Sequence, residues 1–139
     1  MEQRFYSSDV LKITGYKRSR FAQLVGYDFI RPSIQKSTGP GEQNIFSRHD
    51  LYSIRLFQLL TDEITLQREY ASAFVATVDW HAAIKDRYQY LMLVERGSGE
   101  RKCYFAHSPE TVGLEDAEWF LVIRCDRIIN FVDRGVDEL

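Results

Sequence analysis

Three basic side chains within four residues are the first feature of this sequence that could do chemistry. Lys17, Arg18 and Arg20 stand at the start of a stretch whose apolar positions repeat with helical spacing. A guanidinium group matches the two acceptors that guanine presents in the major groove, and both cation types bind phosphate. These residues therefore predict a helix that contacts a polyanion.

Imidazole and thiol side chains are the other groups that could react or hold a metal ion. Imidazole and thiolate are ligands for zinc and copper, and a cysteine beside a histidine can act as a nucleophile. His49, His81, His107, Cys103 and Cys125 are scattered, however, and the cysteines lack C-x-x-C spacing. Cys103 and His107 have no orienting acid or oxyanion loop nearby in the sequence. We therefore expect structural roles for all five, with no metal, no cofactor and no enzymatic activity.

The composition is that of an ordinary soluble globular protein. The 139 residues are 45% hydrophobic and 27% charged, with a formal net charge of -2, which argues against disorder, collagen-like repetition and membrane spanning. This length suffices for one full core or for two small cores that share an interface. The opening MEQRFYSSDVLK has no long apolar stretch, so we expect no signal peptide, no transmembrane helix and a cytoplasmic location.

Charge is distributed unevenly between the two parts of the chain. Residues 1–50 contain eight Lys or Arg and five Asp or Glu, a balance of +3, whereas the remaining 89 residues carry -5. A basic N-terminal part on an acidic body indicates that the N-terminal part meets a polyanion.

Two short helices are predicted at the start of the chain. Ser7 or Ser8 can cap the first, and Gly15 ends it. The second runs over residues 17–25, is closed by Gly26, and buries its apolar positions Phe21, Leu24 and Val25. Its other face presents Lys17, Arg18, Ser19, Arg20, Ala22 and Gln23. Two short helices joined by a turn with a glycine form the helix-turn-helix pattern.

A loop rich in proline and glycine follows, over residues 31–44. It is flanked by Ile30 and by residues 45–46, and we expect it to close as a small two-stranded wing. Ser47 and Asp50 then predict a capping box before a third helix over residues 51–60. Its buried stripe comprises Leu51, Ile54, Phe57 and Leu60.

After a break near residues 61–64, Thr65 can cap a fourth helix over residues 66–78. Its apolar positions are Leu66, Tyr70, Phe74 and Val78. Such a stripe packs either in the core or along a dimer seam, and the dimer seam is favoured.

The pattern changes beyond residue 80 to one typical of strands. Residues 89–94 and 102–106 predict a hairpin around the turn at residues 97–99, and residues 119–124 predict a third strand before an amphipathic last helix. Aromatic residues concentrate in this part: Tyr88, Tyr90, Tyr104, Phe105, Trp119 and Phe120. They favour core packing, with a pocket for a flat or apolar effector as the alternative.

The order of these features resembles the MerR-type winged helix-turn-helix regulators of bacteria over residues 5–76. Five segments carry the resemblance: Tyr6-Ser7, LKITGYKRSRF, GYDFIRPS, TGPG and IFSRHDLYSIRLFQLL. Departures occur at Ala22, Gln23 and Asn44, where the family usually has an arginine, an aromatic residue and an arginine. The C-terminal part also lacks the family's long coiled-coil helix and resembles the short effector-like tails of some members.

The resemblance implies a winged helix-turn-helix domain with a linking helix over residues 1–78. Together with the strand pattern beyond residue 80, this predicts an α+β fold with a small α/β domain for dimerisation or effector binding over residues 79–139. The resemblance also implies a homodimeric transcription regulator that binds double-stranded DNA, and it leaves a small-molecule effector open. The helix at residues 17–25 would enter the major groove and the wing at residues 32–46 would touch the backbone. The expected DNA contacts are Ser7, Lys17, Arg18, Ser19, Arg20, Gln23, Lys36, Gln43 and Asn44.

Two other functions remain open. One is an adaptor whose winged helix has lost DNA contacts and binds protein, as Ala22, Gln23 and Asn44 favour. The other is an accessory protein of phage-type excision, which would bind DNA as clustered monomers.

Overall fold

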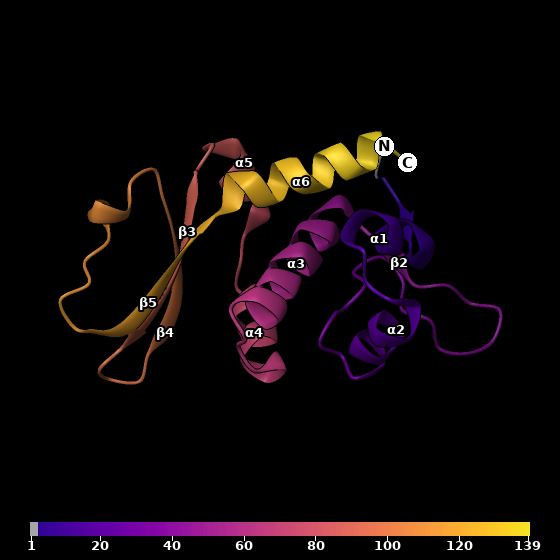
Figure 1. Cartoon of the computed structure of the whole chain (residues 1–139), viewed down its shortest axis with the longest axis horizontal. Coiled ribbons are helices and arrows are strands. Elements are labelled where there is room, and N and C mark those ends of the chain that lie inside the picture. The colour runs from indigo at the N-terminus through magenta and orange to yellow at the C-terminus, as the bar shows by residue number, and fades with distance from the viewer. Residues whose placement is uncertain (1–2) are drawn as a thin grey trace.

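The computed structural model describes residues 3–139, over which the chain forms a mixed α+β fold with six α-helices and two small antiparallel sheets. Helices fill one end of an elongated molecule, and a three-stranded sheet forms the other end (Figure 1). Within the described range, no helix combines the length and the apolar character that crossing a membrane requires.

The first two helices are α1 (Ser7–Thr14) and α2 (Arg18–Gly26). The predicted serine cap of α1 is wrong, because Tyr6 occupies the N-cap and its N–H donates to the carboxylate of Asp9 at 2.8 Å. Gly15 ends α1 with a φ of 76°, a left-handed conformation that glycine adopts without strain. The short turn between the two helices therefore begins at Gly15, the residue at which the sequence predicted that the first helix ends.

The small sheet differs from the predicted wing. Strand β2 (Ile45–Phe46) pairs with β1 (Phe5–Tyr6) rather than with the segment at Ile30. The loop over residues 31–44 closes through one isolated bridge between Gln35 and Ile45. The prediction failed because the apolar residues of β2 are buried against the N-terminal strand, a pairing between distant segments that local patterns do not encode.

The third helix, α3 (Arg48–Gln58), begins at the predicted capping box. The Ser47 side chain accepts from the N–H of Asp50, whose carboxylate accepts from the N–H of Ser47 at 2.9 Å. The predicted stripe is confirmed, since all four of its residues are at most 2% exposed. The chain then continues through a π-helical turn, η1 (Leu59–Glu63), where a break was expected.

The predicted fourth helix is present but shorter than expected, as α4 (Arg68–Val75). A further short helix that was not predicted, α5 (Trp80–Lys85), follows it. Thr65 does not cap α4, because it lies in a left-handed conformation with a φ of 66° and Gln67 takes the cap position. The α4 stripe packs inside the chain, where Phe74 is 4% exposed and lies with its ring centroid 6.1 Å from that of Trp119. The favoured dimer-seam interpretation is therefore replaced by an intrachain core.

The larger sheet contains β3 (Tyr90–Arg96), β4 (Arg101–Ala106) and β5 (Ala117–Arg124), in the order β4-β3-β5. All pairings are antiparallel, so the predicted hairpin and third strand are confirmed. A short 3-10 turn, η2 (Pro109–Thr111), interrupts the connection between β4 and β5. Glu95 ties the sheet to α4, since its carboxylate accepts from Tyr70, Arg101 and Trp119 at 2.8 Å each.

The last helix, α6 (Cys125–Asp137), returns from the sheet to pack on α1 and α3 (Figure 1). Gly135 allows close approach to α1, because a Cβ at this position would lie 2.9 Å from a methyl group of Ile13. Asp133 accepts from Arg48 and Tyr52 of α3 at 2.7 Å each. Buried residues on both sides of the predicted domain boundary at residue 78 form one cluster, so the two predicted domains share their core.

Candidate nucleic-acid interface and adjoining groove

Helix α2 is held on the core by one apolar face and presents the opposite face to solvent. Phe21 is 2% exposed and its ring centroid lies 5.8 Å from that of Phe46. Leu24 and Val25, three and four residues later, are also buried, as the period of 3.6 residues requires. Ser19 and Gln23 are exposed on the outer face, so the helix brings these predicted contacts together with the cations of its first turn.

The first turn of α2 carries positive charge without compensation from an acid. Lys17 is the N-cap, Arg18 is the first helical residue, and both side chains are exposed. Within residues 3–139, neither cation forms an ion pair, and the first turn contains no acidic residue. A helix N-terminus carries partial positive charge, so cations there are disfavoured unless an anion joins them.

The sequence predicts Arg20 as a DNA contact, but in the structure its side chain is engaged within the chain. Its two terminal nitrogens contact both carboxylate oxygens of Asp62 in η1, and its guanidinium lies 5.5 Å from the ring centroid of Tyr16. The hydrogen bonds that Arg20 donates to Asp62 raise the pKa of Arg20. Arg20 therefore ties α2 to the turn after α3, and its charge is already balanced.

The loop over residues 31–44 also uses its polar side chains internally. Lys36 forms an ion pair with Asp28, which lowers the pKa of that carboxyl group. The side-chain oxygen of Asn44 accepts from the N–H of Ser37 at 2.8 Å. Two of the three contacts predicted in the loop are thus engaged in holding its shape.

The tip of the loop is closed by further contacts of the same kind. The Glu42 carboxylate accepts from the N–H and the hydroxyl of Thr38 at 2.9 and 2.6 Å, and these bonds lower the pKa of Glu42. Gln43 is exposed, and its backbone oxygen accepts from the side chain of Gln35. Ser7, the remaining predicted contact, is half-buried at the first residue of α1.

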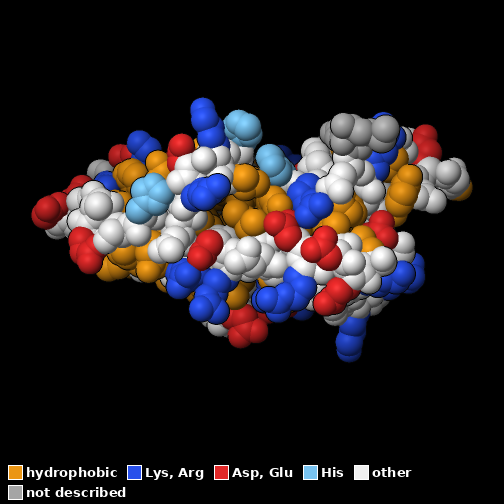
Figure 2. All heavy atoms as spheres, turned by 90° about the horizontal axis from the view of Figure 1, so that it is seen from above, with side chains coloured by type: hydrophobic (Ala, Val, Ile, Leu, Met, Phe, Trp, Pro, Cys, Tyr) orange, Lys and Arg blue, Asp and Glu red, His pale blue; other side chains and the backbone are white. Residues whose placement is uncertain are grey.

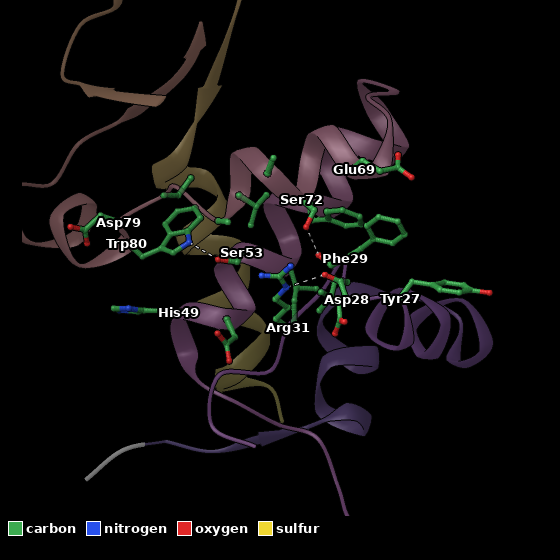
Figure 3. Close-up of a pocket in the computed structure, with 18 residues that line it drawn as sticks. Tyr27, Asp28, Phe29, Arg31, His49, Ser53, Glu69, Ser72, Asp79 and Trp80 are labelled. Atoms are coloured by element: carbon green, nitrogen blue, oxygen red, sulfur yellow. Dashed lines mark hydrogen bonds between the residues drawn. The ribbon is translucent and has the colours of Figure 1, made fainter. Parts of the chain in front are cut away.

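A groove of about 730 Å³ adjoins this region and was not anticipated from the sequence. It lies between the turn after α2, the outer side of α3, and helices α4 and α5 (Figure 3). Its floor contains the buried side chains of Ile54, Phe57 and Trp80, each at most 3% exposed. No local signal marks this groove, because its walls come from four segments that meet only on folding.

The thiols and imidazoles occupy separate structural positions. Cys125 donates to the carbonyl of Tyr88, and burial raises the pKa of its thiol to about 11. Cys103 contacts Thr77 and the carbonyl of Phe74, and burial raises its pKa as well. Within residues 3–139, no three His, Cys, Asp or Glu side chains are grouped so that they could hold a metal ion.

The aromatic residues of the C-terminal part largely pack on one another. Tyr88 stacks on Phe105 and His107 with centroid distances of 5.5 and 4.5 Å. Trp119 packs on α4, whereas Phe120 is 46% exposed on the opposite face of β5. Hydrophobic side chains reach the surface at this end of the molecule (Figure 2). These aromatic contacts support the core-packing interpretation for Tyr88, Phe105 and Trp119.

The chain matches no protein-family model, and no curated protein matches its sequence.

Proposed function

We propose that this chain is a sequence-specific transcription regulator that binds double-stranded DNA through a MerR-like winged helix-turn-helix and acts in the cytoplasm as a homodimer. In this proposal α2 enters the major groove and the loop over residues 32–46 touches the flanking backbone. One observation carries the proposal: Lys17 and Arg18 project, unpaired within the described residues, from the N-terminal turn of an exposed helix. An added anion would relieve the electrostatic cost of that arrangement.

The outer face of α2 has the chemistry that base recognition needs. The amide of Gln23 can donate to and accept from adenine, and Arg18 can bind a phosphate or the acceptors of guanine. Ser19, Ala22 and Gly26 are small and exposed, so the helix backbone can approach the bases closely. Position 22 lacks a cation, so Lys17 and Arg18 must supply the phosphate contacts of this helix.

The proposed dimer follows from the short length of DNA that one recognition helix can contact. One recognition helix covers one half-site, and two copies related by a two-fold axis read an inverted repeat. Phosphate contacts by Lys17 and Arg18 release counterions, so the affinity would fall steeply with salt.

Selection of duplexes from a random DNA pool, at near-physiological salt, tests the proposal. We expect the wild-type protein to enrich an inverted repeat. The variant Lys17→Glu/Arg18→Glu should then bind that repeat at least 100-fold more weakly, because two attractive contacts become repulsive.

The matched control is Lys85→Glu/Arg127→Glu. It makes the same change in net charge at two exposed positions on α5 and α6, away from α2. The control should retain nearly all of the wild-type affinity. Failure of folded wild-type protein to enrich any sequence, or equal losses in the two variants, would contradict the proposal. Enrichment of single sites by a monomer would favour the excision-type function instead.

A protein-binding adaptor is the second candidate, because three predicted DNA contacts are engaged within the chain. Arg20 pairs with Asp62, Lys36 pairs with Asp28, and Asn44 accepts from Ser37. An adaptor needs a rigid loop and tolerates the loss of phosphate contacts. Unchanged retention of Lys17→Glu/Arg18→Glu on a duplex DNA column would favour this candidate.

A further inference from the structure

Arg31 stands at the centre of the groove on a fixed backbone (Figure 3). Its neighbours Ile30 and Pro32 are both buried, and the following proline restricts Arg31 to extended conformations. The turn before it is bound on two sides, since the N–H of Ile30 donates to Leu24 of α2 and Ser72 of α4 donates to Phe29. The root of this side chain is therefore held in place.

The guanidinium itself is oriented but not neutralised. Its Nε donates to the backbone oxygen of Asp28 at 3.2 Å, and Asp28 adopts a left-handed conformation with a φ of 63°. Neither terminal nitrogen of Arg31 has a hydrogen-bond or ion-pair partner among residues 3–139. This geometry leaves a pair of N–H donors available for a bidentate contact with an anion.

The acids around the groove are committed elsewhere. Asp28 pairs with Lys36, and Asp79 accepts from the N–H of Ala82 at the start of α5. Asp50 accepts from the N–H of Ser47, and its other partner, Ser33, donates both its N–H and its hydroxyl. Glu69 lies at the far end of the groove from Arg31 (Figure 3). These carboxylates keep their negative charge, but within the described residues none of them forms an ion pair with the guanidinium of Arg31.

Apolar surface lies next to this charge. Trp80 donates its indole N–H to the hydroxyl of Ser53 at 2.8 Å, which leaves the hydroxyl hydrogen of Ser53 free to donate. Ile54 and Phe57 form the adjoining floor, and Val75 and Val78 form the opposite wall. A volume of about 730 Å³ suits a ligand of one or two rings.

We propose that this groove binds a small aryl carboxylate, with its carboxylate on Arg31 and Ser53 and its ring system against Trp80. The two Arg31 nitrogens match the two oxygens of a carboxylate, and the apolar floor excludes water from the ring. This inference is independent of DNA binding.

The test uses the whole chain without DNA, and 2-naphthoate as the probe. The chain has two tryptophans, and their indole N–H signals in ¹H–¹⁵N spectra report on two places. Trp80 lines the groove, whereas the indole of Trp119 donates to Glu95 at the sheet. We expect a saturable shift of the Trp80 signal and no shift of the Trp119 signal.

Two comparisons separate specific recognition of the carboxylate by Arg31 from nonspecific binding of the ring system. Arg31→Gln should weaken 2-naphthoate binding at least tenfold. The matched control Arg68→Gln should weaken it less than twofold, since Arg68 does not line the groove and its guanidinium is engaged over the ring of Phe29 at the groove's edge. The neutral analogue 2-naphthamide should bind wild type at least tenfold more weakly and should not distinguish wild type from Arg31→Gln.

Three results would overturn the proposal. They are no saturable shift of the Trp80 signal, equal losses in Arg31→Gln and Arg68→Gln, and equally tight binding of inorganic phosphate. If Arg31→Gln does not fold, the comparison of 2-naphthoate with 2-naphthamide on wild-type protein decides, and equal affinities would overturn the proposal. Because no DNA is present, a negative result here leaves the proposed regulator function untouched.

Discussion

Helix α2 and the loop over residues 31–44 were both expected to touch DNA, yet they use their polar side chains in opposite ways. In α2 the exposed cations Lys17 and Arg18 have no ion-pair partner within the described residues. In the loop, Lys36 is paired with Asp28, and Asn44 accepts from a backbone N–H. One region offers its charge to a partner, and the other uses its polar groups to hold its own shape.

The difference follows from where backbone hydrogen bonds are satisfied. A helix satisfies most of its N–H and C=O groups internally, so its outer side chains are free. A loop without a regular ladder must recruit side chains, and Ser37, Glu42 and Asn44 in this loop do so. Polar composition alone therefore does not identify a binding surface.

The largest effect is expected from removing the apolar support of α2. Phe21→Ala should lower the free energy of unfolding by about 3–5 kcal/mol, because this ring is buried between Tyr16 and Phe46. Ile34→Ala in the half-buried root of the loop should cost about 1 kcal/mol. Urea unfolding measures both, and equal costs would show that loop and helix depend equally on apolar packing.

The next effect concerns the anchor of the loop. Asp50→Ala should lower the free energy of unfolding by about 1–2 kcal/mol, because it removes the capping box of α3 and the contacts to Ser33. Asp137→Ala, at the exposed end of α6, is the control and should change stability by less than about 0.5 kcal/mol. If Asp50→Ala had the same unfolding temperature as the wild type, the loop would keep its conformation without its contacts to α3.

Salt dependence of DNA binding sharpens the comparison directly. With the selected duplex, Lys17→Gln should reduce the slope of log K against log salt by about 0.9, the value for one lost phosphate contact. Lys36→Gln should reduce it by less, because Asp28 already balances this cation. If Lys36→Gln reduced the slope more than Lys17→Gln, the main phosphate contact would lie in the loop and not in the helix.

The smallest effect is local and appears in acid. The hydrogen bonds from Thr38 hold the pKa of Glu42 below its ordinary value of 4.5. The contact is therefore fully present above pH 4.5 and is lost as the pH falls through the lowered pKa. The amide shift of Thr38 should titrate below 4.5, while the amide of Gln23 in α2 serves as a reference.

Glu42→Gln is the matched variant for this measurement and should abolish the titration at Thr38. A midpoint at or above 4.5 would show that the loop tip does not hold the charged carboxylate.

Much of the fold could be predicted because its signals are local. Ser47 and Asp50 are three residues apart and form the expected capping box, and Gly15 ends α1 at the expected position. The stripe of α3 and the hairpin of β3 and β4 follow from periods of 3.6 and 2 residues. The cations of α2 were likewise found from the sequence, since one helical turn displays them.

The largest missed features join distant segments. Strand β2 pairs with β1, about 40 residues away in the sequence, and Arg20 pairs with Asp62 across a similar distance. The groove combines the turn after α2 with α3, α4 and α5. Arg31 carried no sequence signal as a ligand contact, because its lack of a carboxylate partner depends on where Asp28, Asp50 and Asp79 point.

The sequence by itself therefore determined helices α1, α2, α3 and α6, the turn at Gly15, the hairpin and the positively charged first turn of α2, since each depends on neighbours within about four residues or on a short turn. Only the tertiary structure decided which charges remain free, where the small sheet forms, and that a groove opens beside Arg31. These outcomes depend on which distant side chains reach one another, and packing of the shared core sets those distances.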